Sequence, residues 1–219
     1  MKKINIAIDG PSGAGKSTIS DILADKLGYI HLDTGAMYRT TALKALEKGI
    51  DLADEDRVVE LINTLDFKQT PDGRIFCNGI DISNDIRQNE ISMAASDVSK
   101  LQNVRKALVA LQQKIAEDKG YIVDGRDICE VVLPDAEVKV FMTASPEERA
   151  KRRVEQNKEK GIPSNYDEIL EDIQKRDYQD SHREFSPLRQ TEDATLIDSS
   201  NMNINEVVDA ILELVKQKI

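Results

Sequence analysis

Residues Ile8–Thr18 read IDGPSGAGKST, and within them Gly10–Ser17 fit the pattern G-x-x-x-x-G-K-[ST]. The apolar run INIAID (Ile4–Asp9) predicts a buried strand before this pattern, and the apolar residues of Lys16–Leu27 recur at helical spacing after it. The glycines let the backbone curl so that successive N–H groups point inward, and a helix N-terminus adds partial positive charge. The stretch therefore predicts a phosphate-binding loop, or P-loop, between a strand and a helix.

The side chains of this loop indicate how a nucleotide would be held. Lys16 should reach the β- and γ-phosphates, and the hydroxyl of Ser17 should bind Mg²⁺, the expected cofactor. A GTPase switch should also carry an N-K-x-D motif, and the nearest string, residues 157–160 (NKEK), lacks the aspartate. We expect the ATP-binding residues of the loop to be Gly10, Pro11, Ser12, Gly13, Ala14, Gly15, Lys16, Ser17 and Thr18.

The rest of the chain alternates apolar runs with helical patterns. Such runs, bounded by polar residues, predict buried parallel strands flanked by helices on both faces. We predict one domain, residues 1–219, of α/β class with a five-stranded parallel sheet. The further strands are expected at Tyr29–Asp33, Tyr121–Gly125, Val138–Ala144 and Ala194–Asp198. Helices are expected at about 35–48, 54–65, 89–99, 104–119, 146–161 and 166–182, with a last helix around Ile204–Val215.

Residues 66–83 break this pattern. Short extended runs are punctuated there by Pro71-Asp72-Gly73 and Asn78-Gly79, which are hairpin signals. We predict a small antiparallel β insert.

Arginines gather at the predicted carboxyl edge of the sheet. Asp33–Arg39 (DTGAMYR) and Asp124–Asp127 (DGRD) each follow a predicted strand, and parallel strand ends share one ligand crevice. Arg176–Arg183 (RDYQDSHR) places its two arginines and Asp180, at i, i+4 and i+7, on one helix face. Because arginine grips phosphate with a fixed fork and stays protonated, the pattern predicts a second anionic substrate. Taken alone, the first segment is also explained by Thr34 as a helix cap beside a surface arginine.

A basic run stands out in an acidic chain. Residues 149–160 hold six basic side chains against two acidic ones, although the net charge of the chain is -10. We interpret residues 149–165 as a lid that closes over the ATP phosphates. The alternative is a solvated helix face.

Charge and hydropathy limit the partners. A net charge of -10 argues against broad nucleic-acid binding. No run approaches the roughly 18 apolar residues of a membrane span, and the start, MKKINIAIDGPSG, does not resemble a signal peptide. We expect a cytoplasmic protein that binds neither nucleic acid nor membrane. Nothing in the sequence demands a dimer, so we expect a monomer.

Six strings, in order along the chain, closely resemble the bacterial cytidylate kinases, which are nucleoside monophosphate kinases. The strings are Ile8–Thr18, Asp33–Arg39, Ala94–Arg105 (AASDVSKLQNVR), Asp124–Asp127, Arg176–Arg183 and Ser186–Arg189 (SPLR). The resemblance implies a P-loop kinase with a β insert in a monophosphate-binding lobe, residues 36–100, and a helical lid. It also implies that ATP phosphorylates CMP, and dCMP, to the diphosphate in pyrimidine metabolism.

The resemblance also implies roles for single residues. Asp127 would accept from the N4 amino group of cytosine, while Arg105 would donate to its ring acceptors. The implied CMP-binding residues are Thr34, Tyr38, Arg39, Ser96, Arg105, Arg126, Asp127, Arg176, Asp180 and Arg183. The implied catalytic residues are Lys16, Arg126, Arg176 and Arg183, and Arg149 and Arg153 would contact ATP from the lid. Apart from the resemblance, we expect Asp124 to help to order the Mg²⁺ shell.

One segment departs from the family pattern. After DGRD and an aliphatic residue the family usually continues Gly-Thr-Val-Val, where this chain has Cys129-Glu130-Val131-Val132. If that glycine has a positive φ, Cys129 would be strained. Glu130 would also bring negative charge near an anion site.

Two other functions stay open at this point. One is a kinase for a different small acceptor, such as UMP or shikimate. The other is a P-loop switch, which would retain its nucleotide and show no dependence on an acceptor.

Overall fold

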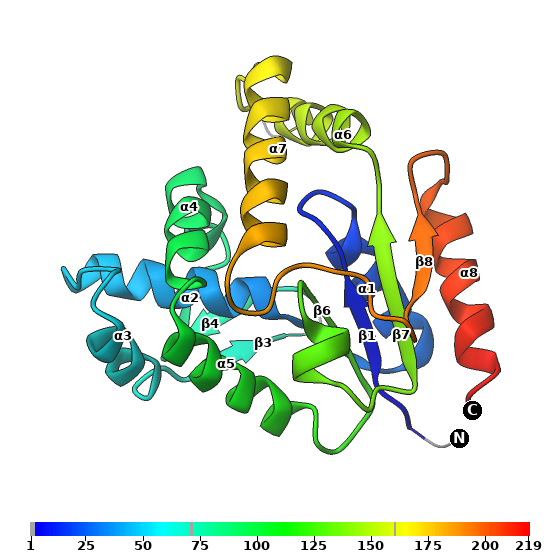
Figure 1. The fold of residues 1–219 in the computed structure, drawn as a ribbon, viewed down its shortest axis with the longest axis horizontal. Helices are drawn as coiled ribbons and strands as arrows, with labels where there is room; N and C mark the ends of the chain where they lie inside the picture. The colour runs from blue at the N-terminus through cyan, green and yellow to red at the C-terminus, as the bar shows by residue number, and fades with distance from the viewer. Residues whose placement is uncertain (1–2, 71, 160) are drawn as a thin grey trace.

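The five predicted parallel strands form one sheet in the computed structural model, which describes residues 3–70, 72–159 and 161–219. The strand order is β2-β6-β1-β7-β8, and all the pairings are parallel. Figure 1 labels four of these strands, β6, β1, β7 and β8. The bounds are β1 Ile6–Asp9, β2 Ile30–Asp33, β6 Tyr121–Gly125, β7 Val138–Thr143 and β8 Thr195–Asp198. The predicted sheet is therefore confirmed, with strand ends that differ by one or two residues.

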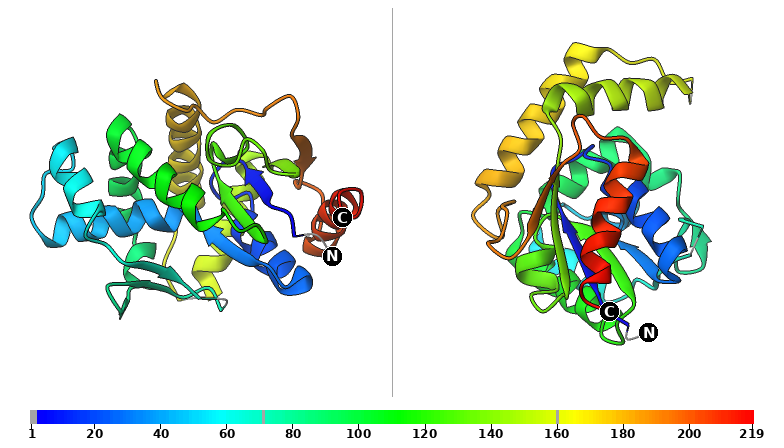
Figure 2. Two further views of the ribbon diagram at one scale, coloured as in Figure 1. Left: turned by 90° about the horizontal axis from the view of Figure 1, so that it is seen from below. Right: turned by 90° about the vertical axis from the view of Figure 1, so that its right-hand side faces the viewer.

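Helices cover both faces of the sheet. Ile6 and Ile8 of β1 pack on one side against helices α1 (Lys16–Leu27) and α8 (Ile204–Lys216). Ala7, between them, belongs to the core on the other side, under the helices α2 to α5 (Figure 2). Those helices are α2 Thr34–Glu47, α3 Glu55–Ile62, α4 Asn89–Val98 and α5 Gln102–Ile115. The central strands β1 and β6 are thus buried on both faces, which explains their apolar runs, whereas the edge strand β8 is exposed at Thr195, Leu196 and Asp198.

The predicted β insert is also present. Strands β3 (Phe67–Gln69), β4 (Ile75–Cys77) and β5 (Ile80–Asp81) form an antiparallel sheet, followed by the short helix η1 (Asp85–Arg87). Asn78 and Gly79 both have positive φ, as a tight hairpin turn requires. Pro71, part of the other turn signal, lies outside the described residues. The insert packs on Ala36 of α2 and so reaches the carboxyl edge of the main sheet.

Two helices rise above that edge. Helix α6 (Pro146–Glu159) follows β7, and α7 (Tyr166–His182) packs against it (Figure 1). Ser145 caps α6, since its hydroxyl accepts from the backbone N–H of Glu148 at 3.2 Å. Lys160 of the predicted lid lies outside the described residues.

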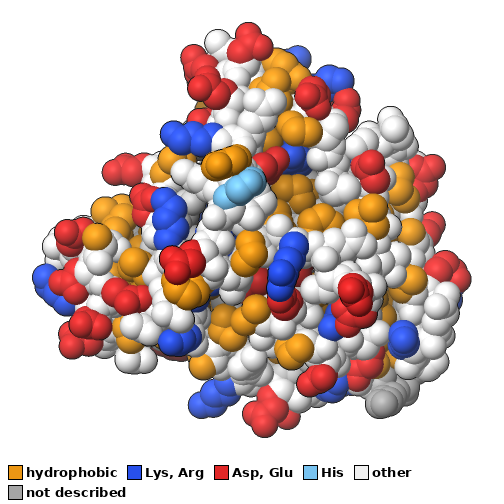
Figure 3. Space-filling model, in the orientation of Figure 1, with side chains coloured by type: hydrophobic (Ala, Val, Ile, Leu, Met, Phe, Trp, Pro, Cys, Tyr) orange, Lys and Arg blue, Asp and Glu red, His pale blue; other side chains and the backbone are white. Residues whose placement is uncertain are grey.

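Charged side chains of both signs are interspersed over the face seen in Figure 3. Among the described helices, none has the length and apolar character needed to cross a bilayer.

Candidate active site

The predicted P-loop connects β1 to α1 and depends on its glycines. Gly10, Gly13 and Gly15 have φ values of 151°, 77° and 93°. A Cβ on Gly10 would lie 1.9 Å from the carbonyl oxygen of Met142, so no side chain fits there. The loop therefore needs glycine both for its curl and for its contact with β7.

Lys16 folds back across this loop. Its Nζ donates to the carbonyl oxygens of Gly10 at 2.8 Å and Pro11 at 2.9 Å. Burial, and then the charge of Arg126, lower the pKa of Lys16 to about 7. An anion in the loop would favour the charged form of this ammonium group.

Two arginines of α6 brace the loop from above. Arg149 donates to the carbonyl oxygens of Ala144 at 2.9 Å and Ser12 at 3.0 Å, and pairs with Asp177 of α7. Arg152 donates to the carbonyl oxygen of Ser199 at 2.6 Å. Arg149 is only 2% exposed, so its donors are used within the protein. Its predicted contact with ATP stays a prediction, as does that of the exposed Arg153.

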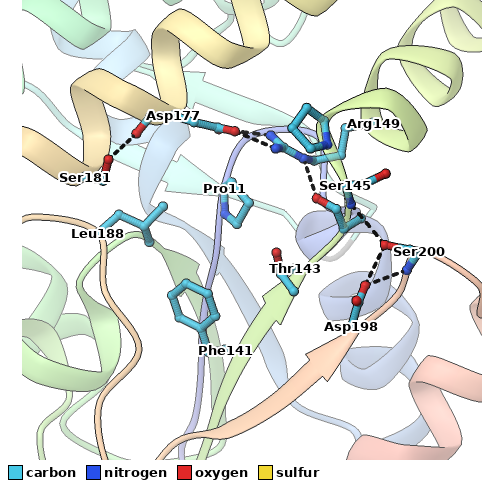
Figure 4. A pocket seen from close by; sticks show the side chains of 12 residues that line it. Pro11, Phe141, Thr143, Ser145, Arg149, Asp177, Ser181, Leu188, Asp198 and Ser200 are labelled. Atoms are coloured by element: carbon cyan, nitrogen blue, oxygen red, sulfur yellow. Dashed lines mark hydrogen bonds and ion pairs between the residues drawn. The ribbon is translucent and has the colours of Figure 1, made fainter.

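A pocket of about 460 Å³ lies beside these braces (Figure 4). The Arg149–Asp177 ion pair crosses from α6 to α7 at its upper side, and Pro11, Phe141 and Leu188 line it. None of the predicted CMP-binding residues lines it. The pocket borders the P-loop but is separate from the predicted acceptor site.

Asp124 connects the P-loop to the sheet edge. It is buried on β6, where its Oδ2 accepts from the hydroxyl of Ser17 at 3.1 Å. Its Oδ1 lies 2.8 Å from Nε2 of His31, whose Nδ1 lies 2.7 Å from Oδ1 of Asp21. A hydroxyl and a carboxylate at a helix N-terminus fit Mg²⁺, which takes hard oxygen ligands together with nucleotide phosphates. Neither His31 nor Asp21 was among the site residues predicted from the sequence.

The charge of His31 follows from these contacts. Burial opposes a charged imidazole, but the hydrogen bonds to Asp124 and Asp21 outweigh it and raise the pKa of His31 to about 10. Both ring nitrogens face carboxylate oxygens, which only accept when ionised. His31 therefore donates from both nitrogens as a cation.

The acceptor side begins at α2, where one prediction was wrong. We expected Thr34 to cap this helix, but Asp33 does so, since its Oδ1 accepts from the N–H of Ala36 at 2.9 Å. Asp33 is the last residue of β2 and still extended, so its carboxylate meets the free N–H groups first. Thr34 is the first helical residue and donates to the carbonyl oxygen of Asp124 at 2.8 Å.

Most of the predicted CMP-side arginines have a carboxylate partner. Arg39 pairs with Asp33 at 2.8 Å, Arg126 pairs with Asp180 at 2.7 Å, and Arg105 pairs with Asp127. The guanidinium of Arg105 also lies 5.7 Å from the ring centre of Tyr38. Burial raises the pKa of Tyr38 to about 12, so this phenol is a donor at neutral pH. The structure thus groups the predicted residues of α2, α5, α7 and the end of β6.

Two further arginines have no carboxylate partner among the described residues. Arg183 donates through Nε to the carbonyl oxygen of Ser186 at 2.6 Å, while its Nη2 is buried without a partner. Burial, and then the charge of Arg126, lower the pKa of Arg176 to about 10. Crowded guanidinium groups of this kind favour an anion between them. Ser96, from α4, donates to Oε1 of Gln179 on α7 at 3.5 Å.

The segment that departs from the family pattern is a π-helix, η2 (Ile128–Val132). Cys129 is not among the described non-glycine residues with positive φ, so the strain that we considered does not arise. The N–H groups of Ile128 and Cys129 donate to the buried carboxylate of Asp9 at 2.8 Å each. Glu130 pairs with Arg189 at the surface, which offsets the charge that it adds.

Comparison with known proteins gives one consistent result. The family model for cytidylate kinase matches residues 6–217. A cytidylate kinase of Caldicellulosiruptor bescii is 55% identical over 98% of this chain and 96% of its own length. One from Bacillus subtilis is 50% identical over 99% of this chain and 98% of its own. A gluconokinase crystal structure from Sinorhizobium meliloti shares the fold, with a TM-score of 0.51 and 16% identity over 99% of this chain and 94% of that one.

Proposed function

This chain belongs to the cytidylate kinase family, and we propose that it transfers the γ-phosphate of ATP to CMP and dCMP in pyrimidine nucleotide metabolism. One observation carries the proposal. The P-loop and the arginines of the acceptor side converge on the carboxyl ends of β1, β2 and β6. A nucleotide switch would have no use for a second cluster of anion-binding groups beside its P-loop.

The reaction is an in-line displacement at the γ-phosphorus of ATP. A phosphate oxygen of CMP forms the new P–O bond, and the bond from the γ-phosphorus to the β–γ bridging oxygen breaks, which yields CDP and ADP. The attacking oxygen is already anionic at neutral pH, so no general base is required. Catalysis then consists of alignment and charge stabilisation by Lys16, Arg126, Arg176 and Arg183.

Ser17 and Asp124 would hold Mg²⁺ on the ATP side. When bound, the cation neutralises charge on the β- and γ-phosphates. The 3.1 Å hydrogen bond between these two side chains supports the assignment, because it brings both oxygen ligands to one place.

We assign selection of cytosine to Asp127, Arg105 and Ser96. Asp127 accepts from the N4 amino group, and uracil would present a carbonyl oxygen to the same carboxylate. A site built on such a hydrogen bond rejects the analogue that cannot make it. Asp127 and Arg105 are only 8% and 5% exposed. This burial supports the role, because a hydrogen bond to the base is stronger away from water and its absence is more costly there.

Closure of two lobes within a single domain completes the proposal. The monophosphate lobe, residues 36–100, and the lid, residues 149–165, would close before transfer, since an open site would let water attack ATP. The internal contacts of Arg149 favour movement in the part of α6 beyond it, where Arg153 is exposed. We expect the enzyme to act as a cytoplasmic monomer.

The test is a coupled assay of ADP release with a panel of acceptors. Purified protein with ATP and Mg²⁺ should form CDP from CMP and dCDP from dCMP, with slower turnover of UMP and none of shikimate. Absence of CDP, or ADP release that does not depend on an acceptor, contradicts the proposal.

A further inference from the structure

We infer that His31 is a positioning residue for the metal site: its imidazole orients the carboxylate of Asp124 toward Ser17 and thereby strengthens binding of the divalent cation with the nucleotide. The inference rests on the proposed function, since it takes Ser17 and Asp124 as the groups that hold Mg²⁺.

The contacts form a chain from the surface to the metal site. Asp21 of α1 holds Nδ1 of His31 at 2.7 Å, and Nε2 holds Oδ1 of Asp124 at 2.8 Å. The second oxygen of Asp124 accepts from Ser17 at 3.1 Å. Each oxygen of Asp124 thus has its own partner, so the carboxylate plane is held in one orientation.

Burial makes the orientation of the Asp124 carboxylate depend on His31. The side chains of His31 and Asp124 are each 5% exposed, whereas Asp21 is 50% exposed. Without the imidazole, Oδ1 of Asp124 would lose its partner where water has little access, and a buried acceptor without a partner is costly. The carboxylate would then rotate or draw in water, and its second oxygen would no longer be held at Ser17.

The sequence supports a role beyond packing. Asp21 and His31 lie between the strings Ile8–Thr18 and Asp33–Arg39, so neither belongs to the motifs that define the phosphate and acceptor sites. His31 buries a polar imidazole within a strand, which is unfavourable unless both ring nitrogens have partners, and here both do. Hydrogen-bonded partners of metal ligands typically change metal affinity by about 10- to 100-fold when mutated.

Two matched substitutions separate positioning from packing. The amide nitrogen of glutamine reaches about as far as Nε2, and that of asparagine about as far as Nδ1. His31→Gln therefore keeps a donor for Asp124, whereas His31→Asn keeps one only for Asp21. Asp21→Ala, at a half-exposed side chain, releases the ring without emptying a buried space.

The experiment measures the binding of Mn²⁺ to the enzyme–ADP complex, monitored through the decrease of the EPR signal of free Mn²⁺. The metal-free control is the binding of ADP in the presence of EDTA. We expect His31→Asn to raise the Kd for Mn²⁺ about tenfold or more, Asp21→Ala to raise it less, and His31→Gln to stay close to the unmodified enzyme. ADP affinity in EDTA should be the same in all of them.

Two outcomes overturn the inference. One is an unchanged Kd for Mn²⁺ in His31→Asn or, if that variant does not fold, in Asp21→Ala. The other is a parallel loss of ADP affinity in EDTA, which would mark a structural role. Because the titration uses no acceptor, its result is distinct from failure of the unmodified enzyme to form CDP, which would refute the proposed function instead.

Discussion

Replacing Asp127 by alanine should relax the preference for cytosine over uracil. On the proposed reading of the base, the substitution removes the acceptor for the N4 amino group, and with UMP it removes a carboxylate that would face the O4 carbonyl oxygen. The kcat/KM for CMP should therefore fall, while that for UMP should hold or rise. ATP affinity should change little, because Asp127 has no contact with the P-loop among the described hydrogen bonds.

The magnitude follows from the kind of bond that is lost. A hydrogen bond to a charged group contributes about 1.5–3 kcal/mol, and about 1.4 kcal/mol corresponds to a tenfold change in rate. The ratio of kcat/KM for CMP to that for UMP should thus fall by roughly 10- to 150-fold. Alanine also leaves Arg105, 5% exposed, without its ion-pair partner. Breaking a buried pair in this way costs about 3–5 kcal/mol of stability.

The control variant is Asp127→Asn. Its amide oxygen still accepts from Arg105, so it should lose less stability than the alanine variant, and its amide nitrogen can donate to O4 of uracil. Steady-state kinetics with both acceptors, together with melting curves, give the two quantities separately. A folded alanine variant that keeps the full preference for CMP would refute base reading by Asp127.

Three further substitutions test other parts of the structure. Gly125→Ala would place a Cβ 2.6 Å from Oγ1 of Thr34. The displaced groups at the end of β6 should lower kcat by about a hundredfold, and an unchanged kcat would contradict this packing. The pKa of Asp180 is lowered because the ion pair with Arg126 outweighs the effect of burial. The ionised carboxylate therefore stabilises the fold at pH values above 3.8, the ordinary pKa, and this stabilisation is lost as the pH falls through the lower pKa of the folded protein. Denaturant titrations should therefore show an Asp180→Asn deficit that is constant near neutral pH and shrinks below about pH 4, and a deficit independent of pH would argue against it. Cys129→Gly should lower stability by at least about 1 kcal/mol, because the residue has no positive φ to relieve; a higher melting temperature would show strain instead.

The sequence predicted the sheet well because its central strands β1 and β6 are buried on both faces and therefore form short apolar runs. It predicted strand ends less well, since those depend on neighbouring chain segments. Asn5, for example, was assigned to a strand, but its side chain donates to the carbonyl oxygen of Ala116 at 2.9 Å. The π-helix at Ile128–Val132 was not predicted at all. Its form depends on Asp9, whose carboxylate receives two N–H groups from a segment about 120 positions away.

The same reasoning explains what was missed at the site. Residues within motifs could be assigned because the spacing itself carries the chemistry, as in Gly10–Ser17. His31 could not, since its partners lie 10 and 93 positions away, at Asp21 and Asp124. The one local signal is a histidine between two aliphatic residues of a predicted strand, Ile30 and Leu32, a place where a polar side chain needs a buried partner.

A count of arginines overstates the positive charge that a second phosphate would meet. Arg39, Arg105 and Arg126 are each offset by a carboxylate within hydrogen-bond reach. The charge left over belongs to Arg176 and Arg183, whose pKa values are lowered by burial and then by neighbouring guanidinium groups. The repelling groups are Arg126 for Arg176 and Arg105 for Arg183, so an anion bound at either residue would offset that repulsion. At Arg39 or Arg126 an anion would instead compete with an existing carboxylate partner. The paired arginines, Arg126 among the catalytic ones, are therefore suited chiefly to alignment, and the unpaired Arg176 and Arg183 to the charge that develops during phosphoryl transfer.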